Sequence, residues 1–372
     1  MSNYNIPDEK NIPDDEFKRI FDDKQLFLPM RWDGNDFLKT VERLLDYYKS
    51  KFENKSNCRE LFNDIERICN GLEMTLQEYL KGFPAKAYAE FEKVMGKLRN
   101  NSLKVYQKTS YGEYIINFND VLSLFRVVNV EDNRTYDRKR VFHTPYNLRS
   151  KVSSSRYSIA GYPSLYLGTT LKLCCAETAN GKKLSLASMF KICRNFSQTG
   201  VHIEVIELGI KPQDFIEVFS RRNFEDDVSR EKWEFKRLLM QNDVKNAYCF
   251  WYPLIACCSY IRVNKKDPFA PEYIIPQLLM QWVRNEMCYN DGKFKKLMGI
   301  RYFSCASIKA SKMGFNYVFP TSGEKMNADS QYCDVLSKTF VLTKPVYIRD
   351  FDSIEECEQE LKRSTDLDLQ KI

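Results

Sequence analysis

Three residues whose types could act together on a nucleotide lie in one stretch of the sequence, FHTPYNLRSKVSSSRYSIAGYPSLYLGTTLKLCCAE, which spans residues 142–177. Tyr166 follows Arg156 by ten positions, and Glu177 follows Tyr166 by eleven. An arginine binds phosphate oxygens as a permanent cation, an aromatic ring packs on a planar group, and a carboxylate stabilises the positive charge that develops as a glycosidic bond breaks. These residue types predict an enzyme that holds an anionic nucleotide and cleaves its glycosidic bond.

The elements that must position these residues follow from the spacing of apolar side chains. Apolar residues recur every three or four positions through residues 31–104, which predicts a small all-helical N-terminal domain after a polar lead-in at residues 1–30. Runs rich in β-branched and aromatic residues then alternate with helical stretches, which predicts a mixed α/β domain at residues 105–350. Residues 351–372 are predicted to form a charged tail that could contain one last helix. We therefore expect an α+β fold.

Composition limits the class of protein. The 372 residues are 43% hydrophobic, enough to bury a full core, and the net charge of +7 favours an anionic substrate. The basic residues form no block and do not alternate with aromatic ones, which argues against nucleic-acid binding. The first thirty residues are too charged for a signal peptide, and no apolar run reaches eighteen residues, so we expect a cytoplasmic protein that does not enter a membrane.

The cysteines do not predict a metal site. Twelve cysteines occur without a CxxC pair, and only His143 and His202 could supply an imidazole ligand. Free thiols in a reducing compartment are the expected state. No GxGxxG turn occurs either, so a nicotinamide nucleotide would be a substrate and not a resident cofactor.

Five pieces of sequence, taken in order, resemble the RES-domain family, which is named for its arginine, glutamate and serine. They are LFRVV, the arginine and the third tyrosine of SRYSIAGYPSLYLG, LKLCCAE and GIRYFS, and they place the key residues at Arg126, Arg156, Tyr166, Glu177 and Ser304. The preceding FHTPYNLRSKV and the later YIIPQLLMQWV are similar to the longer form of the family. Where the short form has tryptophan and asparagine after the arginine, this chain has Tyr157 and Ser158.

The resemblance implies a fold related to mono-ADP-ribosyltransferases and an activity that consumes NAD, which would serve as a toxin or a defence effector. Under it, Arg156 and Arg126 would clamp the pyrophosphate or ribose, and Tyr166 with Tyr157 would pack on nicotinamide or ribose. Glu177 would stabilise the oxocarbenium-like centre, and Ser304 would orient nicotinamide or its ribose. An NAD glycohydrolase or phosphorylase is the first expectation, with water or phosphate as acceptor, and a protein mono-ADP-ribosyltransferase is the second. An antitoxin or regulatory protein is the expected partner.

Two alternatives come from other classes of protein. Arg138 and His143 have the spacing of a HEPN ribonuclease motif, although they lie in a loop of the predicted α/β domain. The chain could also be a binding or regulatory module whose pocket is inactive and whose helical domain is the working part. The helical domain itself is open to three interpretations: a structural domain, a dimerisation domain, or a sensor or inhibitor of the neighbouring enzyme.

Overall fold

The computed structural model describes residues 12–53, 59–100, 123–178, 184–193, 201–220, 242–264, 266–288, 295–322, 331–365 and 367–372. It confirms an α+β fold with a helical N-terminal region. The chain divides into two compact units. A helical unit takes residues up to 116 together with Ile210–Leu278, and a sheet unit takes residues 117–209 and 279–372.

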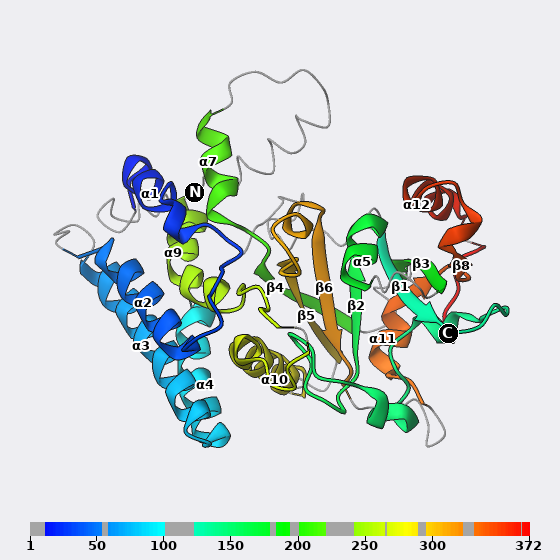
Figure 1. Cartoon of the computed structure of the whole chain (residues 1–372), viewed down its shortest axis with the longest axis horizontal. Helices are drawn as coiled ribbons and strands as arrows, with labels where there is room; N and C mark the ends of the chain where they lie inside the picture. The colour runs from blue at the N-terminus through cyan, green and yellow to red at the C-terminus, as the bar shows by residue number, and fades with distance from the viewer. Residues whose placement is uncertain are drawn as a thin grey trace, which may run out of the picture. The chain divides into compact units, whose positions relative to one another are not determined.

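The described part of the helical unit contains six α-helices. They are α1 (Asp14–Phe21), α2 (Phe37–Ser50), α3 (Arg59–Leu80), α4 (Pro84–Asn100), α7 (Pro212–Ser220) and α9 (Asn242–Cys257), and α10 (Ile274–Cys288) crosses the boundary between the units. Helices α2, α3 and α4 lie side by side (Figure 1). Asp36 caps α2 by accepting a hydrogen bond from the Lys39 amide, as its place before the apolar stripe predicts.

Buried aromatic residues join the two sequence segments of the helical unit. The hydroxyl of Tyr48 in α2 donates to the Cys249 carbonyl at 2.8 Å, and the hydroxyl of Tyr252 in α9 donates to the Leu26 carbonyl at 2.9 Å. The Tyr48 and Tyr252 rings lie 4.6 Å apart. Because a buried hydroxyl needs a partner, each of these tyrosines fixes both its packing and a backbone position.

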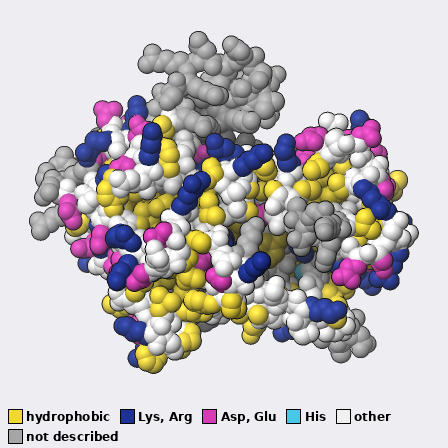
Figure 2. Space-filling view, viewed as in Figure 1, with side chains coloured by type: hydrophobic (Ala, Val, Ile, Leu, Met, Phe, Trp, Pro, Cys, Tyr) yellow, Lys and Arg dark blue, Asp and Glu magenta, His cyan; other side chains and the backbone are white. Residues whose placement is uncertain are grey.

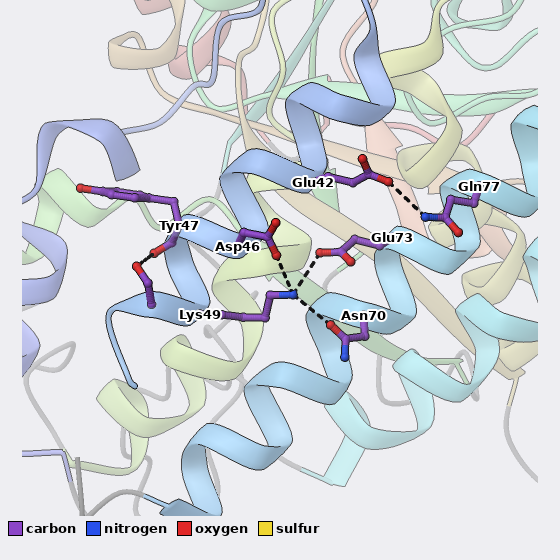
Figure 3. Close-up of polar contacts among 8 residues, drawn as sticks. Glu42, Asp46, Tyr47, Lys49, Asn70, Glu73 and Gln77 are labelled. Carbon is purple, nitrogen blue, oxygen red and sulfur yellow. Dashed lines mark hydrogen bonds and ion pairs between the residues drawn. The ribbon is translucent and has the colours of Figure 1, made fainter. Parts of the chain in front are cut away.

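A polar network crosses from α2 to α3 (Figure 3). Lys49 pairs with Asp46 at 2.9 Å and with Glu73 at 3.4 Å, and it donates to the Asn70 side chain at 3.0 Å. The side chains of Lys49 and Glu73 are only 14% and 17% exposed, so this contact is shielded more than an ordinary surface pair. The network fixes the register of the two helices and contains no arrangement suited to catalysis.

The sheet unit contains one eight-stranded mixed sheet. Its strands are β1 (Leu124–Val130), β2 (Ser164–Gly168), β3 (Leu184–Ile192), β4 (Val201–Leu208), β5 (Lys295–Phe303), β6 (Phe315–Pro320), β7 (Phe340–Leu342) and β8 (Val346–Tyr347). They follow the order β4-β5-β6-β2-β1-β3-β7, with β8 also paired to β3 (Figure 1). Only β4 and β5 run parallel, and the other described pairs are antiparallel. The unit adds α5 (Leu171–Thr178), α11 (Asp334–Thr339) and α12 (Ile354–Arg363).

The C-terminal helix α12 packs on α5 and on the sheet. Cys357 and Leu361 are buried in one apolar cluster with Leu171 and Phe125. Glu358 accepts a hydrogen bond from the Leu171 amide at 2.7 Å, which satisfies an otherwise open donor at the first residue of α5. The segment predicted as a charged tail is therefore part of the sheet unit, and its helix supports α5.

The compact units differ from the predicted boundaries in two further places. Residues 210–278, predicted to belong to the α/β domain, lie in the helical unit because the rings of α9 pack against α1 and α2. The prediction of a polar lead-in is wrong for the described part of residues 1–30, which contains a helix. Residues 14–21 form α1, whose Phe17, Ile20 and Phe21 are buried. Their three-four spacing is short and lies among charged residues, which hides it in the sequence.

Replacing Glu358 with alanine tests the support that α12 gives to α5. Loss of a charged cap costs about 1 kcal/mol, so amide hydrogen exchange in α5 is expected to be about fivefold faster. Mass spectrometry of exchange in peptides that cover Leu171–Thr178 measures this. Glu360→Ala is the matched control, since Glu360 is 57% exposed and pairs with Arg363 in its own helix. Equal exchange in both variants would contradict the capping role.

Candidate functional site

The register of three strands places one row of residues under α5. Gly168 of β2 pairs with Asn316 of β6, and Asn316 pairs with Tyr302 of β5, so all three lie on the same face of the sheet. Helix α5 begins three residues after Gly168 and returns over this row. A Cβ atom at Gly168 would lie 2.6 Å from the Cys174 sulfur, so only glycine permits the close approach of α5.

Glu177 lies in the last turn of α5, where its carboxylate is held from below. Its Oε1 accepts hydrogen bonds from the Ser304 hydroxyl at 2.5 Å and from the Asn316 amide nitrogen at 2.9 Å. Ser304 and Asn316 are buried, and Glu177 itself is exposed to solvent. Within the described part of the chain no side chain donates to Oε2. The carboxylate is thus fixed at one oxygen and open at the other.

Tyr166 fixes the turn that carries Arg156. Its hydroxyl lies 2.8 Å from the Ser155 hydroxyl and 2.7 Å from the Ser158 hydroxyl, and Ser158 also bonds Ser164 at 3.2 Å. Arg156 stands between these two serines in the chain and is 9% exposed. The tyrosine hydroxyl therefore determines where the Arg156 backbone lies.

Tyr302, which the sequence analysis did not single out, lies near several of the side chains that it did. The rings of Tyr302 and Tyr157 lie 4.7 Å apart. Burial raises the pKa of Tyr302 well above its usual value, the nearby Glu177 and Tyr166 add to the rise, and Arg156 opposes it. Tyr302 also pairs with Asn316, whose amide contacts Glu177, and Tyr157 is the chain neighbour of Arg156, so these contacts place Glu177 and the Arg156 turn in one region.

Two residues predicted to contact a substrate are buried in the structure. Tyr157 is 1% exposed, and its ring packs on Tyr302. Ser304 is 0% exposed, and its hydroxyl donates to Glu177, so it orients the carboxylate. Both residues still belong to the region that the sequence predicts.

Arg126 is attached to the site through the backbone. It follows Phe125, which pairs with Gly168, so its side chain leaves β1 on the opposite face of the sheet from α5. Its Nη1 donates to the Tyr166 carbonyl at 2.9 Å, and its Nε is buried with no hydrogen-bond partner. Burial lowers the pKa of Arg126 to about 10. The side chain as a whole is half-buried, and among the described residues no carboxylate pairs with its guanidinium.

The sequence analysis missed Asn316 and Tyr302. Asn316 interrupts the apolar run FNYVFP of β6 and is 6% exposed, so a polar residue in a buried strand was the available signal. Tyr302 stands inside the GIRYFS piece, where nothing in its spacing separates it from its neighbours.

The geometry gives no support to the nuclease alternative. His143 is 0% exposed, its Nδ1 lies 2.8 Å from the Thr144 carbonyl, and its Nε2 accepts from the Cys333 amide at 2.9 Å. Arg138 donates to the Leu342 and Asp368 carbonyls. Both ring nitrogens of the histidine are engaged in bonds to backbone, so the imidazole serves structure.

Neither the charges on the face shown in Figure 2 nor the described metal-binding side chains indicate a second functional site. Lys, Arg, Asp and Glu side chains are interspersed over the face shown in Figure 2. Among the described residues no group of three or more His, Cys, Asp or Glu could hold a metal ion. The described cysteines are free thiols. In the same part of the chain, no helix is long and apolar enough to cross a membrane.

Comparison with known proteins gives one relative. The chain is 28% identical over 345 residues to "Putative toxin YopC" of Bacillus subtilis (strain 168), and the match covers 89% of this chain and 70% of that protein. No protein-family model and no solved structure matches the chain. The resemblance to the RES domain therefore continues to rest on its five sequence pieces.

His143→Gln tests the structural role of the histidine. Burial lowers the pKa of His143 to about 4 from 6.5, so the native protein holds the neutral ring while the unfolded chain takes up a proton. Native stability is then complete above pH 6.5 and falls as the pH drops toward 4. By pH 5 this accounts for about 2 kcal/mol.

The variant is expected to be less stable at pH 7.5 and to lose less stability between pH 7.5 and pH 5, as measured by urea unfolding. A variant with the same pH dependence as the native protein would refute the assignment. RNA cleavage by the native protein that His143→Gln abolishes would restore the nuclease alternative.

Arg126→Met tests the buried cation. Removing a charge with no counter-charge is expected to raise the free energy of unfolding by about 1–2 kcal/mol, after the lost bond to the Tyr166 carbonyl is subtracted. Thermal unfolding at pH 7.5 measures the change. Arg140→Met is the control, because Arg140 is exposed and also bonds one backbone carbonyl. A lower melting temperature for Arg126→Met alone would show that its hydrogen bond outweighs its desolvation.

Proposed function

We propose that this chain is a toxin that consumes NAD by cleaving the bond between nicotinamide and ribose. The observation that carries the proposal is the Glu177 carboxylate, which is anchored at Oε1 and open at Oε2 in one region with Arg156 and Tyr166. The printed name of the relative supports a toxin. The resemblance to the RES family supplies NAD as the substrate.

The proposed chemistry uses the open oxygen of Glu177. NAD would place its pyrophosphate against Arg156, whose guanidinium binds phosphate oxygens bidentately. Glu177 Oε2 would accept a hydrogen bond from a ribose hydroxyl, which strengthens as the glycosidic bond lengthens and the ribose gains positive charge. The C–N bond breaks, nicotinamide leaves with the bonding electron pair, and an acceptor oxygen adds to the same carbon and releases its proton.

Arg126 would contribute through Tyr166. A cation beneath the β2 backbone adds positive potential to the region that receives an anionic substrate. Because Arg126 binds the Tyr166 carbonyl, it also fixes the strand from which Tyr166 holds the Arg156 turn. We propose that its electrostatic role replaces the direct clamp that the sequence predicts.

The acceptor separates two versions of the proposal. Water or phosphate would make the chain an NAD glycohydrolase or phosphorylase, and a protein side chain would make it a mono-ADP-ribosyltransferase. The solvent exposure of Glu177 favours keeping the second version, since a macromolecular acceptor could reach the carboxylate. A toxin that depletes NAD needs an antitoxin or regulatory partner, and the free thiols suit a reducing compartment such as the cytoplasm.

Nicotinamide release from NAD tests the proposal. Purified protein is expected to release nicotinamide, and Glu177→Gln is expected to reduce kcat by about 10²–10³-fold, because it removes the charge that stabilises the transition state. Glu355→Gln is the matched control, since Glu355 lies on α12 and pairs only with Lys172 at the surface.

Three assays decide the acceptor. Release that requires phosphate identifies a phosphorylase, release in its absence identifies a hydrolase, and transfer of label from NAD to protein identifies a transferase. Full activity in Glu177→Gln, or no consumption of NAD in any of the three assays, would overturn the proposed function.

A further inference from the structure

Asn316 is the one amide that contacts the Glu177 carboxylate among the described residues. Its Nδ2 donates to Oε1 at 2.9 Å, and its side chain is 6% exposed in the middle of a buried strand. A carboxylate can only accept hydrogen bonds, so the amide nitrogen must face Glu177. An amide at a buried position costs free energy unless it is paired, so its presence in β6 calls for this contact.

Asn316 and Ser304 hold the same oxygen in different ways. The Ser304 hydroxyl can donate or accept and could bond either protonation state of Glu177. The Asn316 amide nitrogen can only donate and therefore favours the ionised carboxylate. With both donors on Oε1, rotation of the carboxylate is restrained.

We propose that Asn316 is a positioning residue for NAD cleavage, which acts by keeping Glu177 oriented with Oε2 toward the ribose. This inference rests on the proposed function for its catalytic meaning. Its structural content, a direct contact between Asn316 and the Glu177 carboxylate, stands apart from the reaction.

The strand register explains why position 316 serves this purpose. Asn316 lies between Gly168, which has no side chain, and Tyr302, whose ring is occupied with Tyr157. The space that Gly168 leaves brings α5 close, with Cys174 one turn before Glu177. Asn316 therefore occupies the floor directly beneath the end of α5.

The other ionisable groups around this contact keep a constant charge near neutral pH. Burial raises the pKa of Cys174 on α5 to about 12 and raises the pKa of Tyr302 on β5 well above its usual value. Arg156 keeps its charge throughout the working range, and among the described residues Tyr166 on β2 and Cys305 after β5 are the further titratable neighbours of Tyr302. A change in pH dependence on substitution at 316 is therefore assignable to the carboxylate pair that the substitution creates.

Asn316→Asp gives the sharpest test. The variant keeps the shape of the side chain and replaces the donor with a second carboxylate, and two carboxylates at this distance share a proton to higher pH. The acid limb of kcat for nicotinamide release is expected to move up by about one to three pH units. A residue that served only to support the fold would lower activity without moving this limb.

Asn129→Asp is the matched control. Asn129 also donates from a strand to α5, but to the Thr178 carbonyl at 3.0 Å and not to Glu177. The acid limb of this variant is expected to stay at the native position. An unmoved limb in Asn316→Asp, or the same shift in both variants, would overturn the inference.

A double-mutant cycle tests the contact without relying on catalysis. Asn316→Asp is expected to lower the melting temperature more at pH 8 than at pH 5. The apparent pKa of the carboxylate pair is higher in the folded than in the unfolded state, so the variant protein loses stability as the pH rises. Adding Glu177→Gln to this variant is expected to remove the extra loss of melting temperature at pH 8. If the native protein releases no nicotinamide but the cycle shows coupling, the contact stands and the proposed function fails. An additive cycle overturns the inference whatever the activity.

Discussion

The pair of hydrogen bonds to Oε1 of Glu177 is the interaction on which the arrangement of the sheet unit depends. Glu177 stands at the C-terminal end of α5, where the helix dipole disfavours a negative charge by about 0.3–1 kcal/mol. Ser304 and Asn316 offset this with two hydrogen bonds to a charged group, each stronger than a bond between neutral partners. Those two donors come from the end of β5 and from β6, so the strand order β5-β6-β2 and the return of α5 over it are both required.

The same unit carries a second charge that does not help it fold. Arg126 has a buried Nε with no hydrogen-bond partner among the described residues, and burial lowers its pKa to about 10. A strand that served only the fold would carry an apolar residue there, as Phe125 and Val127 on either side do. Groups that oppose stability in this way cluster at functional sites, and here the cation contacts Tyr166, which in turn holds the Arg156 turn.

The sequence could predict residue types but not which residues would touch. The order of Arg156, Tyr166 and Glu177 located the region, and period-two runs located β1, β2 and β4, because both signals are local in the chain. The contacts of Glu177 with Ser304 and Asn316 span more than a hundred residues, and no local pattern encodes them. The burial of Tyr157 and Ser304 was equally hidden, since burial depends on neighbours that the strand register supplies.

The helical unit is bound to the sheet unit by chain connectivity, and this limits what it can be. Strands β4 and β5 are parallel, so the chain must leave the sheet after Leu208 and return before Lys295. That crossover contains Ile210–Leu278, which belongs to the helical unit and holds α9. The rings of α9 are buried against α1 and α2, so the crossover needs the N-terminal helices to cover it. An N-terminal domain that could be removed, like a separate inhibitor, does not fit this arrangement, because residues 210–278 of the helical unit are part of the connection between β4 and β5. The structural interpretation of the helical domain therefore takes precedence, and any regulation would have to act on a unit that the sheet itself helps to build.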